Sequence, residues 1–166
     1  MSKVYIRPVD SSDMHELIGL NQRSQSYHHP WVAPFFDKTG FDTWFSRCQA
    51  RTIVGLVVCK SDSDEIIGLI NINEIVRGAF QSAYLGYYGS VDHAGQGFMT
   101  EALRLAVRYA FEKLELHRLE ANIQPENARS LALVRRVGFT QEGFSPKYLF
   151  VDGKWRDHER WAILNE

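Results

Sequence analysis

The chain has 166 residues, of which 45% are hydrophobic and 23% are charged, a balance typical of a globular protein and unlike that of a disordered one. Its formal net charge is −1, from 19 basic and 20 acidic residues, so it lacks the broad positive field with which proteins bind nucleic acids non-specifically. Residues 1–10 contain no apolar core of a signal peptide, and the longest apolar run, residues 53–59, is far shorter than the ~18 residues of a membrane span.

In the first half of the chain, the spacing of apolar residues predicts two helices and four strands. A short strand is expected at residues 4–8, and Ser11 or Ser12 can cap a helix with Leu17 and Leu20 on its apolar side. Residues 26–40, rich in prolines and aromatic side chains, predict a loop that leads into a second helix. That helix and the three strands after it are expected at about 41–51, 52–60, 65–75 and 81–90, the first two strands forming a hairpin.

The second half of the chain alternates between helical and extended patterns. The expected elements are a helix at about 97–113, a strand at 117–124, a helix that starts after Pro125 and ends at Gly138, and a hairpin of 147–151 and 155–163. A three-stranded meander therefore leads into a β-α-β crossover. This order predicts an α/β fold, a three-layer α/β/α sandwich with a mixed sheet, in a single domain that spans 1–166.

The cysteines and histidines give no sign of a disulfide or a metal site. Cys48 and Cys59 lie in apolar surroundings without CxxC spacing, so we expect reduced, partly buried thiols and a cytoplasmic protein. The pair His28-His29 has no third or fourth ligand at metal spacing, and we expect no metal.

Two glycines mark the most informative segment, at the junction between a predicted strand and a predicted helix. Gly95 and Gly97 let the backbone approach a ligand closely, and the first amides of the following helix have no partners. Such amides, together with the helix dipole, favour a phosphate or pyrophosphate. A tight strand-to-helix turn explains the same glycines. The segment is neither a P-loop nor a GxGxxG fingerprint, because no Lys-Ser/Thr follows Gly97 and position 100 is Thr.

This segment resembles the signature loop of the GNAT N-acetyltransferase superfamily, Gln/Arg-x-x-Gly-x-Gly/Ala, which falls here on residues 94–99. Gly97 matches the central glycine, whereas Ala94 and Met99 depart from the pattern, and Met99 is similar to the variant of the Rim-type subfamily. The chain resembles the Rim-type ribosomal-protein-alanine N-acetyltransferases in further segments, which are residues 77–80, 84–87, 100–103, 117–121, 127–130, 137–139 and 152–158.

The resemblance implies a GNAT-like, mostly antiparallel sheet that is split at the cofactor site, with acetyl-CoA between the fourth and fifth strands. Backbone groups of the fourth strand would pair with the pantetheine arm, and a strand amide there would polarise the thioester carbonyl. The loop amides would hold the pyrophosphate. The implied cofactor-binding residues are Leu85, Gly86, Tyr87, Gly95, Gln96, Gly97, Phe98, Met99, Thr100, Asn127 and Ser130.

The catalytic candidates that the resemblance implies are Glu74, Ser130 and Tyr87. Many members of the superfamily carry a general-acid Tyr seven residues after the Asn that aligns with Asn127, but this position is Val134 here, so Ser130 is the nearest donor. Glu74, at the end of the third strand, is expected to face the amine pocket as general base. The alternatives are a water as base, a Glu74–Arg77 ion pair, a capping role for Asn127 and a solvated Ser130.

The predicted function is transfer of acetyl from acetyl-CoA to the α-amine of a protein N-terminus, an alanine of a ribosomal protein in the first instance. The alternatives are a polyamine or aminoglycoside acetyltransferase and a non-catalytic acyl-CoA-binding module. The expected partner is accordingly a protein N-terminus or a small amine, without nucleic acid or membrane, for a monomer or homodimer. Trp31, Phe35 and Phe36 either wall the acceptor pocket or cover the sheet edge, and Arg129, Arg135 and Arg136 form either a CoA-phosphate contact or a solvated helix face.

Overall fold

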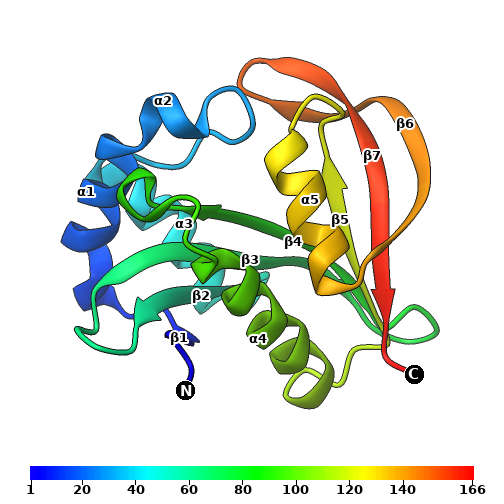
Figure 1. Ribbon diagram of the computed structural model, residues 1–166, viewed down its shortest axis with the longest axis horizontal. Helices are drawn as coiled ribbons and strands as arrows, with labels where there is room; N and C mark the ends of the chain where they lie inside the picture. Colours follow the sequence, from blue (N-terminus) through cyan, green and yellow to red (C-terminus); the bar gives the residue numbers. More distant parts are fainter.

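The fold is built around one seven-stranded sheet, in a computed structural model that describes residues 1–166 (Figure 1). The strand order is β1-β2-β3-β4-β5-β7-β6, and every neighbouring pair is antiparallel except β4 and β5. The strands are β1 (Val4–Pro8), β2 (Ile53–Lys60), β3 (Ile66–Val76), β4 (Ser82–Gly89), β5 (Arg118–Ile123), β6 (Thr140–Val151) and β7 (Lys154–Leu164). The prediction of a mixed, mostly antiparallel sheet is confirmed.

The sheet opens between its two parallel strands. Pairing of β4 with β5 runs only from Ser82–Arg118 to Leu85–Ala121, and beyond these residues the two strands diverge. The rest of β4 stays paired with β3 up to Gly89. Residues 86–89 of β4 therefore have a partner strand on one side only, as expected for a sheet that is split at a binding site.

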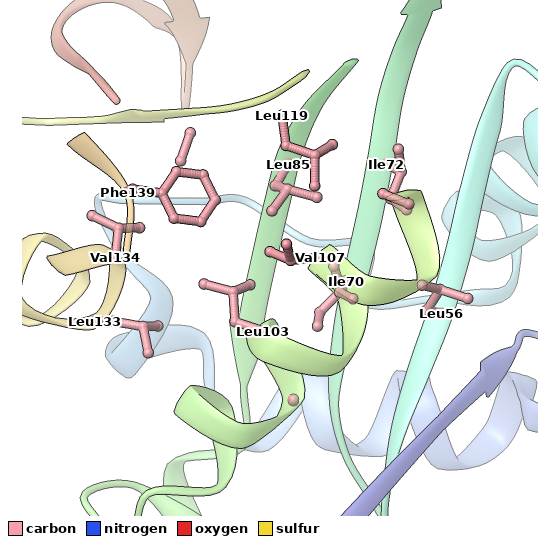
Figure 2. Close-up of a cluster of buried hydrophobic side chains, with 14 of the residues drawn as sticks. Leu56, Ile70, Ile72, Leu85, Leu103, Val107, Leu119, Leu133, Val134 and Phe139 are labelled. Atoms are coloured by element: carbon pink, nitrogen blue, oxygen red, sulfur yellow. The ribbon is translucent and has the colours of Figure 1, made fainter. Parts of the chain in front are cut away.

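Helices cover both faces of the sheet, which makes the three layers (Figure 1). One face packs on α4 (Phe98–Glu112) and α5 (Ala128–Val137) through a cluster that includes Ile70, Leu85 and Leu103, and Figure 2 shows these side chains meeting between sheet and helices. The other face packs on α1 (Met14–Arg23) and α3 (Lys38–Gln49) through a cluster that includes Leu17 and Phe41. The prediction of an α/β/α sandwich is confirmed.

The structure differs from the sequence prediction in three places. Asp10, and not Ser11 or Ser12, is the capping residue, and it caps the turn that precedes α1. The expected loop at 26–40 holds a short helix, α2 (Gln25–His28), and α3 begins at Lys38 because the Asp37 carboxylate accepts a hydrogen bond from the Gly40 amide at 2.8 Å. The last hairpin is longer than expected, since β6 starts at Thr140. Irregular register within β6 hides its alternation in the sequence.

Two single turns complete the fold, one before α1 at Ser11–Asp13 and one after β4 at Val91–His93. No helix of the structure is both long enough and apolar enough to cross a membrane.

Candidate active site

A cavity of about 550 Å³ lies where β4 and β5 diverge. The parts of the chain that line this main cavity are α2 with the segment after it, Ile67 of β3, the end of β4, the segment from Ser90 to the start of α4, the end of β5 with the connection to α5, α5 itself and β7. All eleven residues expected to bind the cofactor contribute to its wall, namely Leu85, Gly86, Tyr87, Gly95, Gln96, Gly97, Phe98, Met99, Thr100, Asn127 and Ser130. The residues that the sequence predicts to bind the cofactor therefore lie around a single cavity in the structure.

Free backbone amides of residues 95–100 line one part of the main cavity. None of the N–H groups of residues 95–100 has an acceptor within the protein, because this segment precedes the first complete turn of α4. Gly95 and Gly97 have φ values of 74° and 81°, which favour glycine, and no atom lies within 4 Å of where a Cβ would stand. Open space, free donors and the N-terminus of a 15-residue helix fit a pyrophosphate group.

The charges around these amides are positive. Arg136 on α5 donates to the Thr100 hydroxyl at 3.3 Å, and Arg129 lines the cavity with its guanidinium 4.3 Å from the centre of the Tyr27 ring. Of the three arginines considered as one cluster, only Arg135 turns away, to lie over Trp161. The nearby acids are occupied elsewhere, Asp92 by Arg23 and Glu101 by Ser2 and the Lys3 amide. An anion would therefore find no carboxylate at this end.

Tyr87 and Ser130 meet in the wall of the main cavity. The Tyr87 Oη and Ser130 Oγ atoms lie 2.6 Å apart, joining β4 to the first turn of α5. Burial raises the pKa of Tyr87 to about 12, so its hydroxyl stays protonated at neutral pH and can donate. Val134, one turn further along α5, is fully buried in the core.

Asn127 determines where Ser130 sits. Its side-chain oxygen accepts a hydrogen bond from the Ser130 amide at 3.3 Å, which makes Asn127 the N-cap of α5. The capping role is confirmed, and Asn127 also borders the main cavity.

Glu74 requires a correction. We expected it to face the amine pocket, but it lines neither large cavity, and its side chain is exposed. The pairing of β3 with β4 is irregular between Asn73 and Val76, and Glu74 has a φ of 49°, so the alternation of side chains is broken there. The alternative ion pair is also absent, because Arg77 donates to the Gln81 side chain and the Leu114 carbonyl.

A second cavity of about 450 Å³ lies on the α3 side of the sheet and shares Val32, Gly86, Tyr87 and Tyr88 with the main cavity. The aromatic residues of the 26–40 segment are divided between these spaces, with Trp31 in the main cavity and Phe35 in the second, while Phe36 is exposed. No Asp or Glu lines either cavity. The charged residues in the two walls are arginines.

The segment around Trp31 is held over the main cavity by contacts between residues far apart in the chain, which no local pattern predicts. Gln124, just after β5, donates from Nε2 to the Pro30 carbonyl at 3.2 Å, and His29 pairs with Asp152 of the β6–β7 turn at 2.9 Å. Figure 1 shows this turn beside the segment that follows α2. His28 lies beneath, with Nε2 donating to the Gly89 carbonyl at 2.8 Å. No group of His, Cys, Asp or Glu side chains is arranged to hold a metal ion.

Comparison with known families supports what this geometry indicates. Residues 3–140 match the model of the acetyltransferase (GNAT) domain family. The chain belongs to this family. It is thus an N-acetyltransferase.

The relatives of this GNAT chain include two kinds of named enzyme. It is 46% identical over 144 residues to the [ribosomal protein uS5]-alanine N-acetyltransferase of Escherichia coli, covering 87% of this chain and 71% of the relative. It is 29% identical over 170 residues to the spermidine N(1)-acetyltransferase of E. coli, covering 97% and 86%. Among solved structures, Mycobacterium smegmatis RimJ in complex with CoA-disulfide superposes with a TM-score of 0.87 and 30% identity, covering 97% of this chain and 81% of that one.

Proposed function

We propose that this acetyltransferase takes acetyl-CoA as donor and acetylates the α-amine of a protein N-terminus, with an N-terminal alanine of a ribosomal protein as the leading candidate. The observation that carries this proposal is the absence of carboxylates from both cavities. The 46% identical relative named for uS5 alanine acetylation supports the choice of acceptor. Acetyl-CoA supplies an activated acetyl group, and the reaction needs a site that also holds an amine in neutral form.

The chain's own groups suit the two ends of such a donor. The amides of residues 95–100 would bind the pyrophosphate, with Arg136 alongside. The backbone of Leu85, Gly86 and Tyr87, at the opening of the sheet, would accompany the pantetheine arm, and a strand amide there would donate to the thioester oxygen. Ser130, held by Asn127 and bonded to Tyr87, would donate to the leaving sulfur.

The Tyr87–Ser130 pair acts as a donor that does not ionise. A free thiol has a pKa of about 8.5, well below the pKa of about 12 for Tyr87, so a lasting transfer of the Tyr87 proton to sulfur is uphill. The pair would instead stabilise the developing thiolate by a hydrogen bond and pass on a proton that comes from the amine nitrogen.

The acceptor chemistry follows from the missing carboxylates. An α-amine has a pKa of about 7.7–8.0, so about a tenth or more of it is neutral at pH 7. A lysine amine, with a pKa near 10.4, needs roughly 3.5 kcal/mol more for its deprotonation. A cavity without acids to assist suits the α-amine better than lysine. It also offers nothing to the additional positive charges of a polyamine.

Spermidine is the second candidate acceptor, because a relative that is 29% identical over nearly the whole chain is named for it. An aminoglycoside is a further small-amine alternative, and a binding module without turnover is the remaining one. A polycation bound here would need carboxylates from outside the two cavities.

Mass spectrometry separates these functions. The protein would be incubated with acetyl-CoA and, in separate reactions, an Ala-initiated peptide with the uS5 N-terminal sequence, the same peptide with a blocked N-terminus and an internal lysine, spermidine, and an aminoglycoside. We expect a gain of one acetyl group on the free N-terminus only. Turnover of spermidine without turnover of the peptide would contradict the proposal, and CoA binding without any turnover would favour the binding module.

We further propose that residues 1–166 act as one catalytic unit, since segments from α2 to β7 line the same cavity. The proposed setting is the cytoplasm, in which Cys48 and Cys59 would stay as the free thiols that the structure shows. We propose neither nucleic acid nor membrane as a partner. We propose that the protein is a monomer or a homodimer in solution.

A further inference from the structure

His158 on β7 is a buried titratable group at the main cavity that the functions above do not use. Only 3% of its surface is exposed, yet it contributes to the cavity wall. We propose that Nε2 of His158 is the general base that takes the proton from the acceptor amine. This inference rests on the proposed function and names the proton acceptor that Glu74 was expected to provide.

The tautomer of His158 is fixed by its own strand. Nδ1 lies 2.8 Å from the Arg156 carbonyl oxygen, and because a carbonyl only accepts, the hydrogen must be on Nδ1. In the neutral ring, Nε2 therefore carries the free lone pair. Nε2 has no hydrogen-bond partner in the protein and is not among the polar atoms sealed from solvent, so its lone pair is available from the cavity.

The sheet register places His158 on the side of the sheet away from Ser130. The pair Ala121–Trp161 faces α5, as the position of Arg135 over Trp161 shows. Side chains alternate along strands, so Asn122 and, one pair beyond the end of β5, Gln124 and His158 face the opposite way. Ser130 and His158 thus reach the cavity from opposite faces, through the opening between β4 and β5.

The reaction needs a proton acceptor and a proton donor on opposite sides of the acetyl group. The amine must attack the carbonyl carbon from one side, while the sulfur leaves toward a donor on another. Ser130, on the α5 side and bonded to Tyr87, suits the sulfur. His158, under the segment that Gln124 holds at Pro30 and Trp31, suits the amine.

A second side chain on the same face is also without a partner. Asn122 lines the cavity and makes no side-chain hydrogen bond within the protein, and its Oδ1 is buried. Buried polar atoms nearly always have partners, so an orphan amide in a cavity wall points to a ligand. Asn122 and His158 are diagonal neighbours on adjacent strands, a separation of about 7–8 Å between Cα atoms, which one amine can bridge.

The surroundings favour the neutral form of His158. Burial lowers the pKa of His158, opposed by its bond to Arg156 and by the neighbouring Asp157. Asp157 itself accepts a hydrogen bond from the Lys147 amide. The Tyr148 ring of β6 packs edge-on against the His158 ring, with 6.3 Å between their centres, and Arg160 on β7 donates to Ser145.

The other titratable groups in the cavity wall are Tyr27, His28, Tyr87, Tyr88, His93, Arg129 and Arg136. No carboxylate in the wall competes for the proton.

The proposed step balances in protons and bonds. The ammonium gives one proton to Nε2 of His158, which leaves a neutral amine and an imidazolium. The C–N bond to the acetyl carbon forms and the C–S bond breaks. A second proton leaves the nitrogen and reaches the sulfur through Ser130, and the imidazolium returns its proton to solvent. The products are the acetylated amine, CoA thiol and one proton.

The test is the pH dependence of kcat/KM for an Ala-initiated peptide, measured for the unmodified protein, His158→Gln and His15→Gln. With His158 as base, the unmodified protein needs neutral His158 and a protonated amine, so its kcat/KM is flat between about pH 6.5 and 7.5. Without that base only the fraction of amine that is already neutral in solution can react. For His158→Gln, a plot of log kcat/KM against pH therefore rises with a slope of one. We expect a loss of about 100-fold at pH 6.5 that shrinks to about tenfold at pH 7.5.

His15 is an exposed histidine on α1 and serves as the matched control, with an unchanged profile expected. CoA affinity of His158→Gln should stay unchanged, which distinguishes a lost base from a damaged fold. A profile of His158→Gln parallel to that of the unmodified protein would overturn the proposal. So would a slope of one in the unmodified protein, a result that needs no variant. Absence of any peptide acetylation would instead contradict the proposed function.

Discussion

At the scale of single residues, the site depends on the backbone of Gly97 and the hydrogen bonds of Ser130. Gly97 has a left-handed backbone at the start of α4, and its amide is one of six consecutive free donors. Ser130 has its amide bonded to Asn127 and its hydroxyl bonded to Tyr87. In the proposed function the first residue serves binding and the second serves turnover, so their substitutions should separate the two.

Gly97→Val should abolish CoA binding, because a branched side chain would stand in the space that a pyrophosphate needs. The left-handed φ also costs about 1–2 kcal/mol of stability for a residue with a Cβ. Calorimetric titration with CoA measures the affinity. Gly78→Val is the control, since Gly78 has a φ of 69° and equally open surroundings but lies in the β3–β4 turn away from the cavity. Tight CoA binding by Gly97→Val would refute the loop assignment.

Ser130→Ala should lower kcat by about 100-fold while CoA affinity changes little, because in the proposed function the hydroxyl acts on the leaving sulfur, and the Asn127 cap bonds only the backbone. Steady-state kinetics with an Ala-initiated peptide, paired with CoA titration, gives both quantities. The exposed Ser46 on α3 provides a matched Ser→Ala control. An unchanged rate would remove Ser130 from the mechanism.

At the scale of elements, the site depends on how β5, β6 and β7 are held together. Arg118 on β5 bonds Glu120 of its own strand at 3.0 Å and Glu142 of β6. This contact spans β7, which lies between the other two strands in the sheet. Because β7 carries His158, the ion pair supports the wall of the main cavity from a distance.

Glu142→Gln should reduce thermal stability at pH 7 and have little effect in acid. The hydrogen bond from Arg118 holds the pKa of Glu142 below its usual value, so the folded protein binds fewer protons here than the unfolded chain. The stabilisation is therefore present above the unfolded pKa and is lost as the pH falls through the lowered one. Melting curves from pH 7 down to about pH 3 should show the two proteins converging below about pH 4. A constant difference at every pH would contradict this account.

At the scale of the whole molecule, the main cavity joins parts of the chain that are far apart in sequence. Its wall includes α2, both strands at the split, the N-termini of α4 and α5, and β7. The two hydrophobic clusters lie on opposite faces of the sheet, and the cavity wall includes Leu85 of the first cluster and Tyr88, which packs against the second. A ligand there contacts both halves of the fold.

CoA should therefore stabilise the entire chain in one transition. At a CoA concentration of 100 times Kd the gain is about 2.7 kcal/mol, which for a chain of this size raises Tm by about 5–10 °C. Scanning calorimetry with and without CoA measures the shift. The Gly97→Val protein should show no such increase. A shift confined to part of a multistep transition would show that the cavity does not connect the two halves.

The sequence anticipated the features that depend on neighbouring residues. Gly95 and Gly97 need positive φ values that only glycine adopts readily, and Asn127 is a capping residue at the start of a helix, so both are visible locally. Glu74 could not be placed in the same way, because the irregular pairing near Asn73 depends on the partner strand. His158 had no signal in the sequence, since its proposed role depends on a hydrogen bond along β7 and on the opening between two other strands.

The order of the strands and of the longer helices, the two-sided covering of the sheet and the free amides ahead of α4 were determined by sequence alone, because periodicity, caps and glycines act over a few residues. Only the tertiary structure decided that Tyr87 bonds Ser130, that no carboxylate lines the cavities and that His158 faces them. Each of these depends on strand register and on where β4 leaves β5. A shift of one residue there would turn every side chain to the other face of the sheet.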